Sequence, residues 1–291
     1  MITVVGSLNI DLTVTTKKYP ELGETIMGES FQTNFGGKGA NQALAAAKLG
    51  GDVQMVGCVG DDSFGEDYKN HLTNAGIIVD HVETVTGVAT GIANITVSEG
   101  DNAIVVVSGA NYKLTPEMIF EKEELIANSS VVVLQLEVPV ETVEKVLEIA
   151  NKHHVTSILN PAPFHELPEK FLEMATYLTP NEHEAKGLMD SQYFSNKYLN
   201  KLIVTFGAQG AAFYQDGKKQ IVPAPAVDVV DTTGAGDTFN GALAYFLDAG
   251  NRLEEAIRKA VYAASLSVTK FGAQGGMPTL GELEEFMEKN A

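Results

Sequence analysis

Residues 231–243, which read DTTGAGDTFNGAL, place a glycine-rich turn, an acidic residue and the start of an apolar helix close together. Gly234 and Gly236 allow positive φ angles and close approach of the backbone to a ligand. From Thr238 onward the apolar residues recur at helical spacing, so Asp237 is expected at or just before a helix N-terminus. The free N–H groups and the dipole of a helix start favour a bound anion. A carboxylate beside such an anion could act as a general base that removes a proton next to a phosphate group.

A second interpretation makes Asp237 a helix cap and nothing more. Aspartate is one of the preferred N-cap residues, so the spacing alone leaves the two roles open. The stretch before the turn contains Val227, Val229 and Val230, and because valine favours strands we expect a strand that runs into the turn.

Asn9 and Asp11 form a second polar group, directly after a short apolar run that ends at Gly6. Residues two apart in an extended segment face the same way, so this amide and this carboxylate could bind sugar hydroxyls together. An ordinary turn with side-chain-to-backbone hydrogen bonds explains the same residues, and taken alone it is the preferred interpretation.

A glycine-rich loop around Lys38 leads into an alanine-rich helix predicted over residues 40–49. It is not a Walker A loop, because Lys38 is not followed by Ser or Thr and the spacing differs. Taken alone, the loop is equally compatible with a helix start that needs close packing.

The second half of the chain alternates regularly between strand and helix patterns. Strands are predicted over residues 131–136, 155–159 and 201–205, and helices over 116–127, 140–151 and 252–268. Glu137 follows the first of these strands, where ligands bind in open α/β sheets. Asn181 and Glu184 lie three residues apart, which suits a helix cap and also suits organisation of Mg²⁺ and phosphate. Residues 205–210 read T-x-G-x-x-G, which is weak evidence for nucleotide binding on its own.

The first half is less regular. Residues 12–35 and a hairpin over 88–98 and 103–108, with its turn at 99–102, are predicted to form short strands outside the main series. A further hairpin is predicted around Asp216 and Gly217.

Composition narrows the possible partners. The chain has 291 residues and a formal net charge of −18, which disfavours nucleic acid and anionic membranes. The same charge repels ATP at long range, so a phosphate site must rely on helix N-termini, a metal ion or a few lysines. Cys58 is the single cysteine, which excludes an intrachain disulfide. The chain opens on a strand-like run without a basic leader, and no apolar run approaches the ~18 residues of a transmembrane helix. We expect a cytoplasmic protein.

Taken together, these motifs resemble those of the ribokinase family of sugar and nucleoside kinases, also called the PfkB family. The resemblance runs from Gly6 to Pro278 and includes, in the family's order, G-x-x-N-x-D, G-G-K-G-A-N-Q, N-x-x-E, T-x-G-x-x-G and D-T-x-G-A-G-D. It implies a three-layer α/β/α fold with a mostly parallel central sheet, as a single domain over residues 1–291. It also implies a small β-sheet lid formed by residues 10–35 and 86–111. Residues 185–200 are shorter than the usual passage in this family.

The resemblance implies an ATP-dependent sugar kinase that converts D-ribose to ribose 5-phosphate. The rival acceptors are deoxyribose, fructose or a nucleoside. A more distant rival is a sugar-binding regulator without catalysis. Polar residues such as Asp11 and Lys38 favour a small polyol over a nucleoside, and the intact G-A-G-D string argues against the regulator. Mg²⁺ and a monovalent cation such as K⁺ are implied as cofactors, and a homodimer through paired lids would cover exposed strand edges.

The resemblance also implies roles for individual residues. Asp237 would be the catalytic base, with an anion hole formed by the backbone of Gly234, Ala235 and Gly236. The sugar would contact Asn9, Ile10, Asp11, Gly37, Lys38, Gly39, Ala40, Asn41, Glu137 and Asp237. The nucleotide side would comprise Asn181, Glu184, Thr205, Phe206, Gly207, Ala208, Gln209, Gly210, Gly236 and Asp237. A monovalent cation would be held by Asp231, Thr233, Ser267, Lys270, Gly272 and Gly276, several of them through backbone carbonyls. The family commonly has Ser where Gly276 stands.

Overall fold

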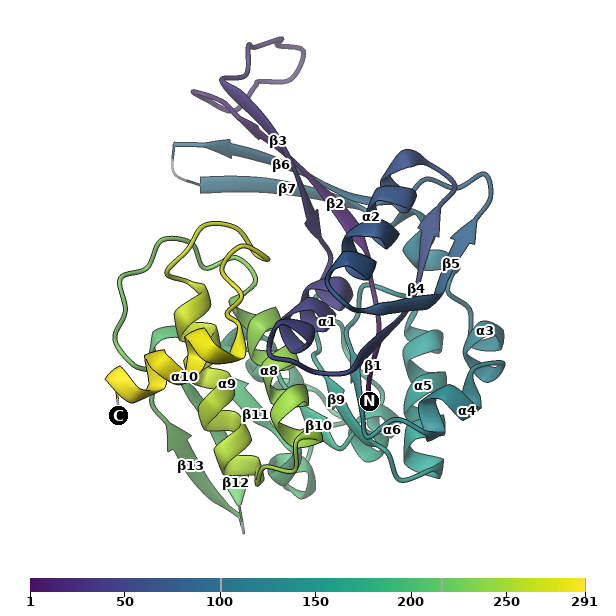
Figure 1. The fold of residues 1–291 in the computed structure, drawn as a ribbon, viewed down its shortest axis with the longest axis vertical. Helices are drawn as coiled ribbons and strands as arrows, with labels where there is room; N and C mark the ends of the chain where they lie inside the picture. The colour runs from purple at the N-terminus through teal and green to yellow at the C-terminus, as the bar shows by residue number, and fades with distance from the viewer. Residues whose placement is uncertain (100, 216, 291) are drawn as a thin grey trace.

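A parallel sheet runs through the centre of the molecule (Figure 1). The computed structural model describes residues 1–99, 101–215 and 217–290, so Gly100 and Asp216 of the two predicted turns lie outside the described part. The strand order is β10-β9-β8-β1-β4-β5, and each neighbouring pair is parallel. The bounds of these strands are β1 Ile2–Val5, β4 Val53–Gly60, β5 Ile78–Val85, β8 Val131–Leu134, β9 Thr156–Leu159 and β10 Tyr177–Leu178.

An antiparallel group of strands extends the central sheet at its β10 edge. Parallel bridges join Leu178 to Leu202 and Asn181 to Thr205. The order there is β11-β12-β13, with bounds Ile203–Thr205, Ala211–Gln215 and Lys218–Val222.

Helices cover both faces of the central sheet because its strands are apolar on both sides. Along β1, Ile2 and Val4 belong to one hydrophobic cluster, and Val5 belongs to the other. The first cluster is covered by α1 (Lys38–Lys48), α2 (Ser63–Asn74), α8 (Ala235–Asp248), α9 (Leu253–Ser267) and α10 (Leu280–Lys289). The second is covered by η1 (Gly109–Lys113), α3 (Pro116–Phe120), α4 (Glu123–Ala127), α5 (Val140–Lys152), α6 (Glu169–Met174), α7 (Glu182–Asp190) and η2 (Asn196–Lys201).

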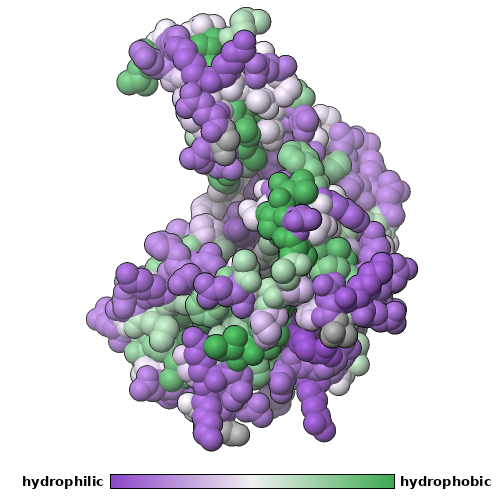
Figure 2. Space-filling model, turned by 90° about the vertical axis from the view of Figure 1, so that its left-hand side faces the viewer, coloured by the Kyte–Doolittle hydropathy of each residue, from purple (hydrophilic) through white to green (hydrophobic). Residues whose placement is uncertain are grey.

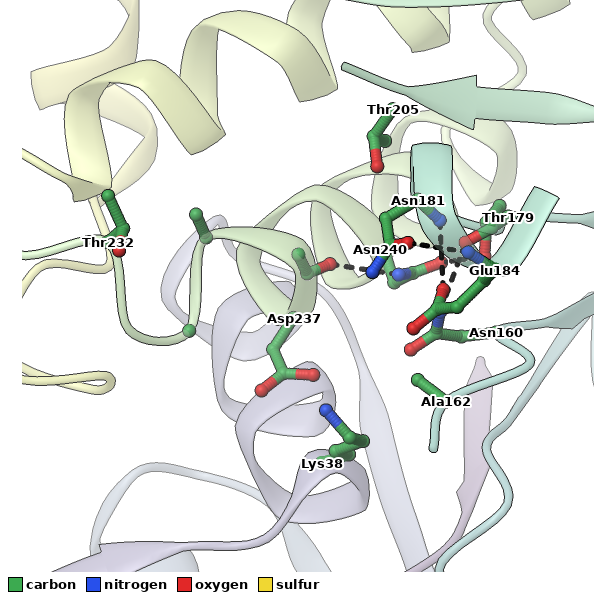
Figure 3. Close-up of a pocket in the computed structure, with 13 residues that line it drawn as sticks. Lys38, Asn160, Ala162, Thr179, Asn181, Glu184, Thr205, Thr232, Asp237 and Asn240 are labelled. Atoms are coloured by element: carbon green, nitrogen blue, oxygen red, sulfur yellow. Dashed lines mark hydrogen bonds between the residues drawn. The ribbon is translucent and has the colours of Figure 1, made fainter. Parts of the chain in front are cut away.

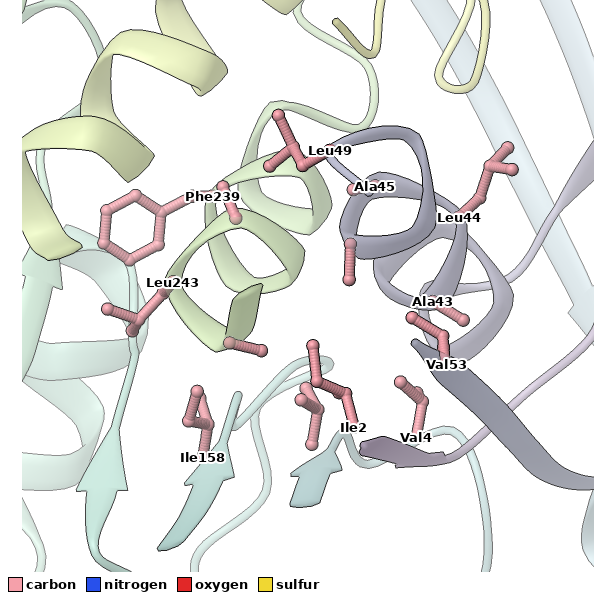
Figure 4. Close-up of a cluster of buried hydrophobic side chains, with 14 of the residues drawn as sticks. Ile2, Val4, Ala43, Leu44, Ala45, Leu49, Val53, Ile158, Phe239 and Leu243 are labelled. Atoms are coloured by element: carbon pink, nitrogen blue, oxygen red, sulfur yellow. The ribbon is translucent and has the colours of Figure 1, made fainter. Parts of the chain in front are cut away.

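The helices α1 and α8 lie side by side over the sheet, and their packing fixes the position of the glycine-rich turn and of the loop before α1. Figure 4 shows Ala43 and Ala45 of α1 and Phe239 and Leu243 of α8 above Ile2. Small alanine side chains let the two helices approach closely. The expected three-layer α/β/α core is confirmed.

A small sheet projects from this core (Figure 1). Its order is β3-β2-β6-β7, with bounds β2 Asn9–Thr15, β3 Ser30–Gly36, β6 Gly91–Ser98 and β7 Asp101–Val107. The pair β2–β6 is parallel, and the outer pairs are antiparallel. The space-filling view is hollowed between this sheet and the body of the molecule (Figure 2).

Two sequence predictions about these elements are wrong. Residues 227–230 form no strand. Val229 and Val230 are 58% and 61% exposed, and Val230 donates a single backbone bond to the Val268 carbonyl at 2.8 Å. Valine favours a strand where a neighbouring strand and a buried face are present, and this loop lacks both within the described residues. The helix predicted over 116–127 is two short helices, α3 and α4.

Among the helices of the described residues, none has the length and the apolar character that a membrane span requires.

Candidate active site

The glycine-rich turn ends at Gly234, which is the N-cap of α8 and has a φ of 76°. A side chain here would be strained, and a Cβ would lie 2.9 Å from the Cα of Ala273. The helix starts at Ala235, which makes Asp237 the third residue of its first turn. The interpretation of Asp237 as the cap is therefore wrong, and its carboxylate is available for another role.

The N–H groups of this first turn do not all serve as an anion site. Ala235 donates its N–H to the Thr232 carbonyl at 3.2 Å. The N–H groups of Gly236 and Asp237 have no partner within the helix by virtue of their position. All three residues line a cavity of about 210 Å³ at the start of α8. This cavity is smaller than the ~300–1,000 Å³ of a typical ligand pocket, so it suits the reacting end of a larger ligand.

Asp237 is 7% exposed, and both of its carboxylate oxygens accept hydrogen bonds from amides. Asn41 donates through Nδ2 to Oδ2 at 2.9 Å, and Gln42 donates through Nε2 to Oδ1 at 3.0 Å. Burial raises the pKa of Asp237, although nearby Lys38 and the two amides act in the opposite direction. A carboxylate with a raised pKa and a fixed orientation has the properties of a general base.

Lys38 lies on the opposite wall, and Figure 3 shows its side chain and the Asp237 carboxylate pointing toward one another. Burial lowers the pKa of Lys38, but Asp237, Glu137 and Glu184 together raise it above its ordinary value. Lys38 is therefore a fixed positive charge, which suits phosphate oxygens or the negative charge that develops during phosphoryl transfer.

Asp11, Glu137 and Asp237 are three carboxylates near one another. Burial, with repulsion from Glu137 and Asp237, raises the pKa of Asp11 to about 6. Glu137 accepts hydrogen bonds from Ser7 Oγ and from the backbone N–H of Lys38, the latter at 3.0 Å. Several hydrogen-bond acceptors near one point suit a ligand with several hydroxyl donors, such as a sugar.

Asn9 is buried, and its Oδ1 accepts a bond from Asn111 Nδ2 at 2.7 Å. Asn111 also holds the backbone of Leu8 through both ends of its amide, at 2.9 and 3.1 Å. Sequence reasoning missed Asn111 because it lies 102 residues further along the chain from Asn9.

The other predicted sugar-side residues lie around these groups. Ile10 is buried next to Asn9 in β2. Gly37 is the N-cap of α1, and Gly39, Ala40 and Asn41 are buried in its first turns.

The nucleotide-side residues divide into two groups. Asn181 and Glu184 line the same cavity as Asp237 and form a capping box at the start of α7, with bonds of 2.9 and 2.8 Å. Asn181 and Glu184 therefore cap α7 and line the cavity at the same time. Thr205 also lines the cavity. Phe206, Gly207, Ala208, Gln209 and Gly210 are not among its lining residues. They form a tight turn, closed by the bond from Phe206 N–H to the Gly210 carbonyl at 2.8 Å.

Glu184 is the carboxylate of this cavity, apart from Asp237, that would face a magnesium ion bound to the phosphates of a nucleotide. Burial raises the pKa of Glu184, partly offset by the Asn181 N–H and by Lys38. Within residues 1–99, 101–215 and 217–290, no three His, Cys, Asp or Glu side chains form a metal cluster. A Mg²⁺ ion at this place would therefore take most of its ligands from phosphate oxygens and water, as is usual for this ion.

The predicted cation ligands lie behind the glycine turn. Asp231 accepts the N–H and O–H of Thr233 at 2.9 and 2.7 Å and the N–H of Gly272 at 2.9 Å. Burial raises the pKa of Asp231, but these bonds outweigh it and lower the pKa overall. A Cβ at Gly276 would lie 2.1 Å from the Ser267 carbonyl, so a serine would not fit here without a shift. The Lys270 side chain pairs with Glu282 at 2.9 Å, so its backbone is the part left for a cation.

Sequence reasoning gave no role to several buried or half-buried amides near Asp237. Gln42 was within a recognised motif but had no assigned function. The side chains of Gln135, Asn160, Asn240 and Gln274 extend the hydrogen-bond network around Asp237. No spacing rule connects these residues, because they come from different elements and meet only in the folded chain.

Known proteins are similar to this chain in sequence, and solved structures are similar to it in fold. The model of the "pfkB family carbohydrate kinase" matches residues 1–280. A ribokinase of Bacillus subtilis is 49% identical, over 98% of this chain and 99% of the relative. A deoxyribokinase of Salmonella typhi is 38% identical, over 99% of both chains. The structure of Arabidopsis thaliana ribokinase complexed with ribose and ATP has a TM-score of 0.91 and 34% identity, over 99% of this chain and 98% of that one. The chain therefore belongs to the pfkB family of carbohydrate kinases, enzymes that transfer a phosphoryl group to a hydroxyl group.

Proposed function

We propose that this protein is an ATP-dependent ribokinase that phosphorylates the 5-hydroxyl of D-ribose. The observation that carries the proposal is the position of Asp237. Asp237 lies near the acidic residues Asp11 and Glu137, and it also lines the cavity at the start of α8. The 49% identity to a ribokinase and the similarity to a ribokinase holding ribose and ATP support ribose as the acceptor.

In the proposed mechanism, Asp237 accepts the proton of the sugar hydroxyl as the oxygen attacks the γ-phosphorus. Asn41 and Gln42 hold the carboxylate in place. The N–H groups of Gly236 and Asp237 and the ammonium group of Lys38 stabilise the charge that develops on the phosphoryl oxygens. Mg²⁺, when bound, supplies charge neutralisation at the phosphates, and Glu184 would orient its water ligands. The γ-phosphate thus binds between α1 and the start of α8.

The small sheet would act as a lid over the sugar. Asn9 and Asp11 lie at the inner end of β2, and the hollow below the sheet is open to solvent (Figure 2). Closing that hollow would exclude water, which would otherwise compete with the sugar as phosphoryl acceptor. Because ATP is supplied in the cytoplasm, we place the reaction there.

The proposed function is tested by a coupled assay of ADP formation with a panel of acceptors under saturating Mg-ATP. Deoxyribose is the main rival, because a deoxyribokinase is 38% identical over 99% of the chain. Fructose and a nucleoside complete the panel. We expect the highest kcat/KM with D-ribose. A higher value with deoxyribose would reassign the substrate within the family, and ADP formation with none of the acceptors would refute the proposed function.

We further propose a K⁺ site formed by Asp231, Thr233, Ser267, Lys270, Gly272 and Gly276. A large cation with carbonyl ligands fits this loop better than Mg²⁺, which demands compact octahedral ligation. Since the Asp231 turn leads directly into Gly234, the ion would set the geometry of the anion site. We expect kcat in tetramethylammonium buffer to be at least about tenfold lower than in K⁺, since small misplacements at a reacting centre can cost about 10²-fold.

Asp231→Ala is expected to remove this response to K⁺. Asp228→Ala is the matched control, because Asp228 is an exposed carboxylate three residues earlier in the same loop. It should keep the full activation. Equal rates of the wild-type protein in K⁺ and in tetramethylammonium would argue that no such site operates.

We also propose that the protein forms a homodimer through its small sheets. The outer strand β7 exposes apolar side chains, with Val105 64% and Val107 52% exposed, and such edges are usually covered in native proteins. Sedimentation at micromolar concentration should give twice the 31.1 kDa chain mass. The variant Val105→Lys/Val107→Lys should sediment as a monomer. Ile221→Lys, at an exposed position of β13, should remain dimeric. A wild-type monomer would contradict the proposal.

A further inference from the structure

The two amides that hold Asp237 have a choice of orientation. A side-chain amide has a donating nitrogen at one end and an accepting oxygen at the other, and a half-turn exchanges them. Asn41 and Gln42 both present nitrogen to the carboxylate, at 2.9 and 3.0 Å. In the opposite orientation an amide oxygen would face a carboxylate oxygen, and this acceptor–acceptor contact would be repulsive.

Behind each of these amides lies a glutamine that favours the observed orientation. Gln135 donates through Nε2 to Oε1 of Gln42 at 2.6 Å. Gln274 donates through Nε2 to Oδ1 of Asn41 at 2.9 Å. Turning either amide would bring two N–H groups face to face on this side and two acceptors face to face at Asp237.

The surroundings of Gln135 make its amide oxygen energetically unfavourable, which indicates that its N–H group has a role. The side chain is fully buried, directly after β8, and within the described residues its Oε1 has no hydrogen-bond partner. This oxygen lies against the backbone of Gly6, where a Cβ would be 2.0 Å away. A buried acceptor without a partner is unfavourable, so an apolar side chain would be expected here if packing were the sole requirement.

Gln274 is held from the other direction. Its Oε1 lies 2.8 Å from His71 Nε2 of α2, and its backbone carbonyl accepts a bond from Lys48 Nζ at 2.9 Å. Both ends of the Gln274 amide therefore have a partner, and the tautomer of His71 that carries the proton on Nε2 keeps the Gln274 nitrogen toward Asn41.

We propose that Gln135 and Gln274 are positioning residues for phosphoryl transfer, which lock Gln42 and Asn41 with their N–H groups toward Asp237. On Gln42, Gln135 acts together with Asn160, whose Oδ1 accepts a bond from Gln42 Nε2 at 3.2 Å. Each glutamine acts through a separate amide on a separate oxygen of the carboxylate. The inference rests on the proposed role of Asp237 as the general base.

Loss of either lock should change the protonation of Asp237. The charged groups that face Asp237 are Lys38 of α1, Asp11 of β2 and Glu137 after β8, and the ionisable Tyr68 hydroxyl of α2 lies nearby. A change at Gln135 alters none of these groups. Gln274 Nε2 also lies 3.5 Å from the Tyr68 hydroxyl, so Gln135→Met is the cleaner of the two variants. The amide donors lower the pKa of Asp237 against the effect of burial, so losing one donor raises that pKa. A higher proportion of the base is then protonated at low pH.

The test is the pH profile of single-turnover phosphoryl transfer at saturating Mg-ATP and ribose. In Gln135→Met and Gln274→Met, the acid limb of this profile should move to higher pH by about one unit, the size expected from weakening one charged hydrogen bond. At pH values below the midpoint of the limb, the rate should fall about tenfold, and it should recover at higher pH.

Gln54→Met is the matched control. It also removes a buried glutamine bond from a strand, the one to Thr3 Oγ1 at 2.7 Å, without a connection to Asp237. Its limb should not move.

A double-variant comparison separates the lock from general damage. In the Gln42→Met background, Gln135→Met should cause no further shift, because the amide it orients is absent. Combining Gln135→Met with Gln274→Met should add the two shifts. An unchanged acid limb in both single variants would overturn the proposal, as would an equal shift in Gln54→Met. If Gln135→Met does not fold, the half-buried Gln274 carries the same test.

A second readout does not depend on the reaction. The ¹³C chemical shift of the Asp237 carboxyl carbon, followed against pH in the free protein, should report the same upward change in pKa. A wild-type protein that phosphorylates no acceptor would refute the proposed function, and this titration would still decide whether the lock exists. A carboxyl titration identical in wild type and both variants would refute the lock itself.

Discussion

Asp237→Asn is expected to lower kcat by about 10²–10⁴-fold, the usual contribution of a general base. Asparagine keeps the size of the side chain and its place in the first turn of α8, but it cannot accept the proton of the sugar hydroxyl. Mg-ATP affinity, measured by calorimetry, should stay nearly unchanged, since the first-turn N–H groups and Lys38 remain. The loss should therefore appear in kcat and leave nucleotide binding intact.

The control for Asp237→Asn is Asp67→Asn, which changes an exposed carboxylate on α2. This variant should have wild-type activity. Thermal unfolding of both variants should show a cooperative transition. A folded Asp237→Asn protein with near-normal kcat would exclude Asp237 as the base and would return the assignment to a purely structural role.

Asp11→Ala is expected to weaken ribose binding by about 10²-fold, because hydrogen bonds to a charged group contribute about 1.5–3 kcal/mol. Removing this acceptor leaves sugar hydroxyls without a partner in a closed site. Asn41→Ala should act in the same direction. Isothermal titration with ribose measures both effects. Asp80→Ala, at an exposed position of β5, is the control and should bind ribose normally.

The pH dependence of ribose affinity gives an independent check on Asp11. Its pKa is raised to about 6, and the carboxyl group accepts hydrogen bonds with both oxygens when it is ionised. Ribose affinity should therefore be complete about one pH unit above 6, where Asp11 is ionised, and should fall as the pH drops through 6 toward the ordinary aspartate value. Asp11→Ala should lose this step. Unchanged ribose affinity in both Asp11→Ala and Asn41→Ala would mean that the sugar binds elsewhere.

The resemblance to a known family implied the fold class and the neighbourhood of the site, and local patterns in the sequence agree with both. Apolar runs such as residues 131–136 read as buried strands whatever surrounds them. The motifs around Asp237 and Lys38 lie at the starts of helices, where spacing and glycine content are informative. The structure brings these two residues together across α1 and α8, which the resemblance to a known family had implied.

The features that the sequence did not predict depend on contacts between distant parts of the chain. Asn111 lies in η1 and Gln274 in a loop, and their relation to Asn9 and Asn41 exists only after folding. The spacing alone left the cap role of Asp237 open, and the structure excludes it because the αL conformation of Gly234 starts the helix earlier than the apolar pattern indicates. Val229 and Val230 have strand propensity, but propensity gives no strand without a neighbouring strand to pair with.

The strand β2 connects the residues on the sugar side of the site with the exposed strand of the small sheet. Its inner end carries Asn9 and Asp11, and its whole length pairs with β6, which in turn pairs with the exposed strand β7. If a second protein chain binds at β7 and favours one arrangement of β2, it changes the affinity of Asp11 for a sugar. Thermodynamic reciprocity then requires that the sugar change the affinity between the two chains by the same factor. Ribose concentration and protein concentration would thus be linked variables in any titration of this enzyme.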